Sequence, residues 1–202
     1  MSTMRIMTAA ALAAVFAVFT ASAQQPTTQR VAGTLEKVEG NTLTIKAASG
    51  PVILKLADNA LVVARIKASA ADIKAGDYVA SGGVPQPDGT QKAVELRIFP
   101  ESMRGNGDGH RPGWPGAPNG TMTNGEVGSA VSSVEGPVVT VKYKGGEKKI
   151  VVGSSTPIVK YIITDKSELK QGASINITRA VKKADGSFEA ARIQVARDGL
   201  AL

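Results

Sequence analysis

The chain has 202 residues, with 24 Lys and Arg against 17 Asp and Glu, a formal charge of +7 and no cysteine. The absence of cysteine excludes disulfides, thiolate metal sites, a cysteine nucleophile and a lipid-modified N-terminal cysteine. The fold must therefore be held together by an apolar core.

Residues 1–23 have the pattern of an export signal peptide. Arg5 precedes an apolar run from Ala9 to Phe19, and Ala21-Ser22-Ala23 supplies the small residues at which signal peptidases cut. The run is shorter than the ~20 residues that a membrane-spanning helix needs. We therefore expect this segment to be removed, leaving a periplasmic or secreted chain without a membrane span. Loss of Arg5 leaves 23 basic and 17 acidic residues, a formal charge of +6.

Two segments of the remaining chain repeat each other at an offset of 96 residues. VAGTLEKVEGNTLTIK begins at Val31, and VGSAVSSVEGPVVTVK begins at Val127. The register continues through residues 69–76 and 165–172, and after one inserted residue Asp88-Gly89 matches Asp185-Gly186. The repeat predicts two copies of one module, residues 31–100 and residues 127–199.

Each copy alternates apolar and polar residues as β-strands do. Hairpins are predicted around Ser49-Gly50 and around Gly145-Gly146, because glycine adopts the positive φ of tight turns. Further strands are predicted at 61–66, 78–81 and 93–99 in the first copy, and at 158–163, 174–179 and 190–195 in the second. The chain is therefore expected to be mainly β.

One short helical turn interrupts the strands of each copy. Ser69 with Asp72, and Asp165 with Glu168, have the spacing of a capping box, and a glycine ends each turn. Five or six strands with one short helix predict a small OB-like barrel for each copy. The alternative is a single sandwich in which both copies contribute strands to shared sheets.

The shared pattern resembles a family of exported bacterial domains of unknown function with small OB-like barrels. It combines V-x-G-x-x-x-x-V-x-G, a short turn ending in K-x-G and a D-G dipeptide before a strand. The first copy carries it at Val31, Gly33, Val38, Gly40, Ile73, Lys74, Gly76, Asp88, Gly89 and Ala93. The second carries it at Val127, Val134, Gly136, Leu169, Lys170, Gly172, Asp185, Gly186 and Ala190, with Ser129 where the first copy has Gly33. The resemblance implies a fold and a cell-envelope setting, and no catalytic residue.

Residues 101–126 form a Gly/Pro-rich connector between the two modules. Its glycines and prolines argue against a helix or a regular strand interior. Trp114 is too large an aromatic residue to be left in water, so we expect it to pack into a barrel groove and fix the connector in place. The alternative is a solvent-exposed tether.

The connector also holds His110, the only histidine of the chain, with Met103 and Met122 on either side in the sequence. One imidazole and two thioethers would suit copper(I) in an exported protein. A periplasmic copper-binding protein is therefore the alternative function. Metal sites usually show more ligands than this, so the primary expectation is that no cofactor is bound.

The sequence shows no nucleophile motif and no carboxylate pair that would indicate an enzyme. The expected contact surface is instead a basic hairpin, made of Lys142, Tyr143, Lys144, Lys148 and Lys149. OB-like barrels bind extended ligands through such charged and aromatic faces, although edge lysines also serve to prevent aggregation. We expect a non-catalytic binding or adaptor protein whose partner is an anionic envelope polymer, a lipid or another envelope protein, and not nucleic acid.

Overall fold

The computed structural model describes residues 27–133, 136–197 and 199–200, and the predicted signal segment lies outside them. The described chain is mainly β, as predicted, with three single-turn 3₁₀ helices and no α-helix. The strands are β1 (Thr28–Glu39), β2 (Thr42–Ala47), β3 (Gly50–Ala68), β4 (Tyr78–Pro85), β5 (Gln91–Phe99), β6 (Gly109–Pro112), β7 (Thr121–Val131), β8 (Val138–Tyr143), β9 (Gly146–Val151), β10 (Ile158–Thr164), β11 (Ser174–Lys182) and β12 (Phe188–Ala196). The 3₁₀ helices are η1 (Ala70–Asp72), η2 (Glu101–Met103) and η3 (Lys166–Glu168).

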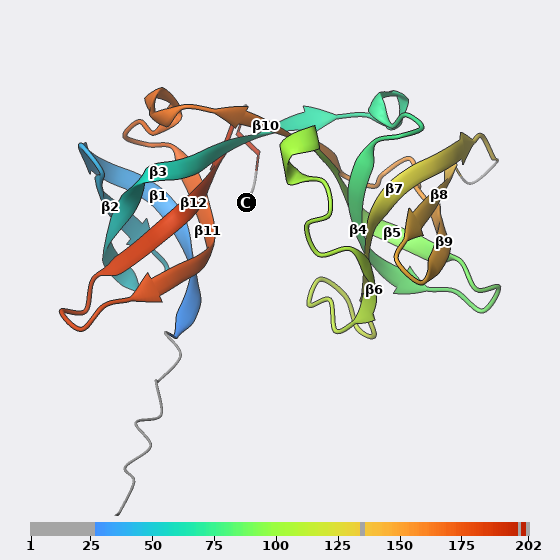
Figure 1. Ribbon diagram of the computed structural model, residues 1–202, viewed down its shortest axis with the longest axis horizontal. Helices are drawn as coiled ribbons and strands as arrows, with labels where there is room; N and C mark the ends of the chain where they lie inside the picture. Colours follow the sequence, from blue (N-terminus) through green and yellow to red (C-terminus); the bar gives the residue numbers. More distant parts are fainter. Residues whose placement is uncertain (1–26, 134–135, 198, 201–202) are drawn as a thin grey trace, which may run out of the picture.

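Five strands close a barrel that forms the first lobe, on the left of Figure 1. β1 pairs with β2 and β11, β2 pairs with β3, and β12 joins β11 to β3 through a parallel pairing. The alternating residues of these strands point inward and form one apolar cluster that includes Leu43, Leu54, Ile177 and Ile193. Strands from both ends of the chain therefore share this core.

The second lobe, on the right of Figure 1, contains a second ring of paired strands. β4 pairs with β5 and β7, and β8 pairs with β7 and β9. A short parallel contact between β5 and β9, at Gln91↔Ile150 and Lys92↔Val151, completes the ring. A separate apolar cluster, which includes Val79, Leu96, Val141 and Ile150, fills this lobe.

The strand pairing differs from the division expected at residues 31–100 and 127–199. β1–β3 of the first copy pair with β11 and β12 of the second copy, and β7–β9 of the second copy pair with β4 and β5 of the first. Each lobe thus takes three strands from one copy and two from the other. The exchange is geometrically simple because the two copies carry equivalent strands at equivalent positions.

β3 and β10 carry the chain from one lobe to the other (Figure 1). β3 continues for 19 residues where the sequence predicted two separate strands, and its second half pairs with β10 in antiparallel register. β12 then flanks β3, and β5 flanks β10, both in parallel. These four strands, in the order β12-β3-β10-β5, form one continuous bridge sheet between the lobes (Figure 1).

The predicted turns are present as 3₁₀ helices, and their caps differ between the copies. Ser69 and Asp72 form the expected capping box of η1, in which the Ser69 backbone N–H donates to the Asp72 carboxylate at 2.8 Å. In η3 the Asp165 carboxylate instead accepts from the Ser167 backbone N–H, and Glu168 pairs with Arg197. A nearby arginine thus takes the carboxylate that would otherwise complete the second box.

The predicted connector contains more regular structure than expected. Residues 101–103 form η2, residues 109–112 form the edge strand β6 on β7, and residues 121–126 already belong to β7. Pro112 has no backbone N–H to donate to a neighbouring strand. It is tolerated because it ends an edge strand, where no further backbone donor is needed. The connector therefore lies against the second lobe.

Candidate functional site

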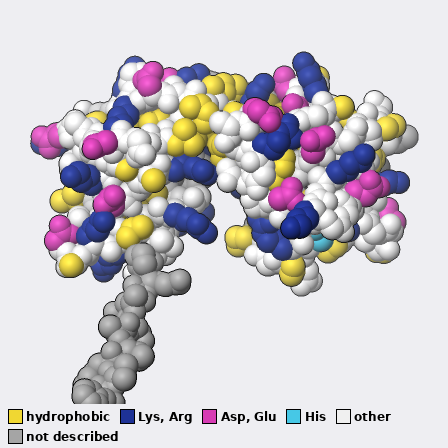
Figure 2. Space-filling model, viewed as in Figure 1, with side chains coloured by type: hydrophobic (Ala, Val, Ile, Leu, Met, Phe, Trp, Pro, Cys, Tyr) yellow, Lys and Arg dark blue, Asp and Glu magenta, His cyan; other side chains and the backbone are white. Residues whose placement is uncertain are grey.

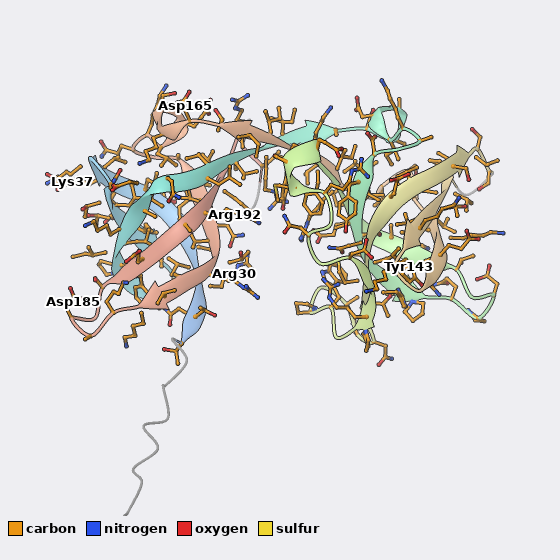
Figure 3. The ribbon with its side chains drawn as sticks, viewed as in Figure 1. Arg30, Lys37, Tyr143, Asp165, Asp185 and Arg192 are labelled. Carbon is orange, nitrogen blue, oxygen red and sulfur yellow. The ribbon has the colours of Figure 1, made fainter. Side chains whose placement is uncertain are left out.

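The basic hairpin lies on the outside of the second lobe, in β8 and β9. Lys142, Lys144 and Lys149 are exposed, and the Lys148 ammonium donates to the Gly89 carbonyl at 3.3 Å. Tyr143, labelled in Figure 3, stacks on the His110 ring with centroids 6.2 Å apart. The shallow cavity beside the hairpin, about 390 Å³, is also lined by the carboxylates of Asp108 and Glu126. These acids offset part of the positive charge of the lysines.

Arg104 and Tyr78 line the same shallow cavity and already have partners. The Arg104 guanidinium binds the carboxylates of Glu101 and Glu126 at 2.6 and 3.0 Å. Burial, together with the nearby carboxylate of Asp108, raises the pKa of Tyr78 to about 12. Tyr78 therefore stays protonated at neutral pH and donates to Asp108 at 3.3 Å. Arg104 and Tyr78 are therefore already engaged by neighbouring groups of the protein.

Trp114 packs against the second lobe. A Cβ atom built on Gly82 of β4 would lie 2.2 Å from the indole, and one built on Gly116 would also lie 2.2 Å from it, so both positions need glycine. The backbone N–H groups of Gly113 and Trp114 both donate to the Gly120 carbonyl at 3.0 Å and close the loop around the ring. The glycines of the connector thus allow close packing of one aromatic residue.

His110 and the two methionines lie in different surroundings. The Nδ1 atom of His110 is 2.8 Å from the Thr123 hydroxyl. Met122 precedes Thr123 on β7, so its side chain points to the opposite face, and it lines the space between the lobes. Met103 is buried in a third cluster with Val63 and Tyr161. Among the described residues no group of three His, Cys, Asp or Glu side chains is placed to hold a metal ion.

The most strongly charged concave surface is the cleft between the two lobes. Two adjoining cavities of about 650 and 600 Å³ share Arg97, Tyr161, Thr178 and Gln194 in their linings. Together they are lined by six arginines, which define the arginine cleft: Arg30, Arg65, Arg97, Arg111, Arg179 and Arg192. Glu95 is the acidic residue of these linings. Figure 2 shows basic side chains along the hollow between the lobes, and Figure 3 shows Arg30 and Arg192 reaching into it from the first lobe.

The bridge sheet forms the floor of the arginine cleft. Residues of β3, β5, β10 and β12 alternate, so that one set enters the barrel cores and the other faces the cleft. Leu96 and Ile98 belong to a core and the intervening Arg97 faces the cleft, while Gln194 lies between the core residues Ile193 and Val195. The chain thus places polar residues at alternate positions of strands that are otherwise apolar.

The floor arginines have few partners within the protein. Arg65 is only 9% exposed, and its guanidinium lies 5.8 Å from the ring centroid of Tyr161. Arg97 forms an ion pair with Glu95, and none of the other five cleft arginines forms an ion pair within the described residues. On the walls, Arg30 donates to the Asn176 side chain at 2.7 Å and Arg111 to the Gly107 carbonyl at 2.7 Å. Arginine keeps its charge in proteins, so the cleft is strongly positive.

Three buried side-chain polar atoms in the described part of the chain lack a hydrogen-bond partner, and all three belong to residues that line the cleft. They are the Nε atoms of Arg65 and Arg97 and the Oδ1 atom of Asn124. Buried polar groups in proteins are nearly always hydrogen-bonded, so such exceptions point to a function or to a missing partner. The cleft is therefore the best candidate site of the molecule.

The sequence did not indicate this cleft. Its arginines come from β1, β3, β5, β6, β11 and β12, and no two of them form a local cluster. The signal in the sequence that could have indicated the cleft was an arginine between apolar residues of a core strand, as at Arg65 and Arg97.

The comparisons with known proteins found no relative of this chain. No protein-family model matches the chain, no curated protein matches its sequence, and no solved structure matches its fold. The resemblance to the exported OB-like family therefore stays a prediction. Within residues 27–133, 136–197 and 199–200, no helix has the length and apolar character needed to cross a membrane.

Proposed function

We propose that the chain is an exported, non-catalytic binding protein that holds an anionic polymer of the cell envelope in the arginine cleft. The observation that carries the proposal is the convergence of six arginines on one concave surface that also contains one carboxylate. Guanidinium groups match the geometry of carboxylate, phosphate and sulfate groups and bind them through paired hydrogen bonds. The doubled β module and the export pattern, together with its resemblance to OB-like domains, support the envelope setting.

The arginine cleft replaces the basic hairpin as the proposed contact surface. The hairpin is exposed and borders a shallow cavity with acidic neighbours, whereas the cleft is recessed and Arg65 on its floor is buried. Charges in a recess with low-dielectric walls attract an anion more strongly than the same charges in open water.

A linear polymer fits this site better than a lipid surface. A flat membrane cannot reach Arg65, which is 9% exposed at the floor between the two lobes. An extended chain can lie along the two adjoining cavities and contact arginines of both lobes. We expect its affinity to fall as salt is added, because part of the binding energy is ionic.

The lining of the cleft also supports a binding role over catalysis. Its carboxylate, Glu95, is held by Arg97 in an ion pair, and no histidine lines the two cavities. A general base with a free nucleophile beside it, which hydrolysis requires, is not present in these linings.

Two variants with equal loss of charge test the proposal. The rim variant changes Arg30, Arg111, Arg179 and Arg192 to Gln, and the hairpin variant changes Lys142, Lys144, Lys148 and Lys149 to Gln. Binding of polygalacturonate to the mature chain is measured by calorimetry at low and at physiological salt. We expect the rim variant to lose about tenfold or more in affinity, equivalent to about 1.4 kcal/mol, and the hairpin variant to lose little.

Phosphatidylglycerol vesicles serve as the competing probe in the same experiment. Absence of binding to every polyanion at low salt would refute the proposal. Equal losses in the rim and hairpin variants would show that binding follows net charge and not the cleft.

A further inference from the structure

We infer that the floor of the arginine cleft is a specific seat for an acidic oligosaccharide, of which one oxyanion group binds Arg65 and Arg97 and one hydroxyl donates to Asn124. This inference rests on the proposed function and adds to it the chemical class of the ligand. The rim arginines attract any polyanion, but the floor presents donors and an acceptor in a fixed arrangement.

Strand register brings the two floor arginines to the same face of the bridge sheet. Arg65 is paired with Tyr161 of β10, and Arg97 is paired with Val159 two residues earlier on that strand. The two arginines therefore flank β10 on opposite sides, with their Cα atoms about 10–12 Å apart from strand spacing and rise. Arginine side chains are long enough to converge on one anion across this distance, and both line the same cavity.

The free hydrogen-bonding atoms of the floor specify the ligand. The Nε–H groups of Arg65 and Arg97 are buried donors, so they require acceptors such as carboxylate, phosphate or sulfate oxygens. Asn124 already uses its amide nitrogen to donate to the Asn106 carbonyl at 2.9 Å, so its free Oδ1 requires a donor. Arg97 lines both adjoining cavities, whereas Arg65 lines one of them and Asn124 the other. A ligand that extends along both cavities and offers an oxyanion and a hydroxyl therefore satisfies all three atoms. An oligosaccharide of sugar acids has both groups along its length.

Burial of Arg65 without an ion-pair partner is costly in the free protein. A buried charge that lacks a compensating partner destabilises the folded state, and its cation–π contact with Tyr161 recovers only part of this cost. A residue kept in this position for ligand binding should therefore lower the stability of the free chain. A residue kept for structure should raise it.

The test compares Arg65→Met and Asn124→Ala with the wild-type chain, using two probes of similar charge spacing. Oligogalacturonate carries carboxylates and hydroxyls, and oligoglutamate carries carboxylates alone. We expect the wild type to prefer oligogalacturonate by about tenfold or more, since hydrogen bonds to charged groups and satisfied buried atoms contribute on this scale. Arg65→Met is expected to weaken oligogalacturonate binding about 10- to 100-fold while leaving the melting temperature unchanged or higher. Asn124→Ala is expected to remove the preference and to keep oligoglutamate affinity.

Three results would overturn the inference. One is equal wild-type affinity for oligogalacturonate and oligoglutamate. Another is unchanged oligogalacturonate affinity in Arg65→Met. The last is a lower melting temperature of Arg65→Met with unchanged affinity of its folded fraction, which would mark Arg65 as structural. Loss of binding in the rim variant together with any of these results would leave the proposed function standing, so the two failures can be distinguished. A dextran sulfate oligosaccharide, which carries sulfates and hydroxyls but no carboxylate, separates sulfate from carboxylate as the preferred anion.

Discussion

Arg65 and Tyr161 occupy equivalent positions in the two sequence copies and face each other across the pairing of β3 with β10. Their side chains form a cation–π contact, with the guanidinium carbon 5.8 Å from the ring centroid. The pair lies at the midpoint of the β3–β10 register, which runs from Ala68↔Ile158 to Val62↔Thr164. A contact between two unlike side chains therefore lies at the centre of the strand pairing that joins the two copies.

This relationship predicts how each copy behaves alone. Because the strands of the two copies are exchanged, a single copy can complete two barrels only by pairing with a second molecule of itself. In a dimer of residues 27–100, Arg65 would face another Arg65, and the like charges would repel each other. In a dimer of residues 121–200, Tyr161 would face another Tyr161 without a charge penalty. We expect sedimentation analysis to show a dimer for the second fragment at concentrations where the first does not dimerise.

The matched control for these fragments is Arg65→Tyr in residues 27–100, which should restore dimer formation. A first fragment that folds as a stable monomer would contradict the prediction, because it would show that one copy can close a barrel by itself.

Gly82 predicts the position of the single tryptophan of the chain. A Cβ atom at this residue would lie 2.2 Å from the Trp114 indole, so Gly82→Ala must displace the ring from β4. We expect the tryptophan fluorescence of this variant to shift to longer wavelength, as the indole becomes more exposed to water. Gly153→Ala is the control, because its Cβ would make an ordinary 3.5 Å contact and should leave the spectrum unchanged. An unchanged spectrum in Gly82→Ala would show that Trp114 does not lie over β4.

A buried polar network predicts a second effect, on stability. The side-chain amide of Gln91, which is fully buried, donates to the Ser81 carbonyl at 3.0 Å and accepts from the hydroxyls of Thr121 and Thr123 at 3.1 and 2.6 Å. Gln91→Ala removes these three hydrogen bonds and leaves a cavity inside the second lobe. We expect a loss of about 2–4 kcal/mol in the free energy of unfolding, from the lost hydrogen bonds and the cavity, measured by urea denaturation.

Exposed Gln29 provides the comparison for this measurement, and Gln29→Ala should change stability by less than about 0.5 kcal/mol. A similarly small effect of Gln91→Ala would mean that the network contributes little to the second lobe.

His110 predicts a dependence of stability on pH. Burial, together with the nearby charge of Lys148, holds the pKa of His110 below its usual value of 6.5. The unfolded chain therefore binds a proton at higher pH than the folded chain does. The contribution of His110 to stability is fully present above pH 6.5 and is lost as the pH falls through the usual value toward the lowered one. Subtracting the unfolding free energy of His110→Gln from that of the wild type should isolate this slope, and a flat difference would contradict it.

The hydrogen bonds around His110 identify the tautomer of its neutral imidazole. The Thr123 hydroxyl donates to the Gln91 side-chain oxygen at 2.6 Å, so it accepts from His110 and requires a proton on Nδ1. The neutral imidazole therefore leaves Nε2 as its acceptor atom.

The sequence predicted the strands because their alternation is a local property. The two hairpins and the turns before β4 and β11 follow from nearby residues such as Gly145 and Gly76. The exchange between copies could not be predicted in this way, because the outward and inward positions of β4 and β11 are alike. Either strand has the pattern to complete either barrel, and the path of the chain after β3 decides the outcome.

The candidate site was missed for a related reason. Arg30, Arg97 and Arg192 are far apart in the sequence, and each is a single charge on a strand that resembles an ordinary surface position. Only the bridge sheet brings them together. The prominent local cluster at Lys142–Lys149 lies instead on an exposed hairpin with acidic neighbours.

The crossing of β3 and β10 between the lobes has a mechanical consequence. Two hydrogen-bonded strands that pass through the middle of the molecule leave no single flexible joint about which one half could swing. A ligand would therefore enter a cleft whose width stays nearly constant and is set before binding. The choice between ligands would then depend on rigid complementarity. The rates of association and dissociation would be governed by diffusion along the open channel.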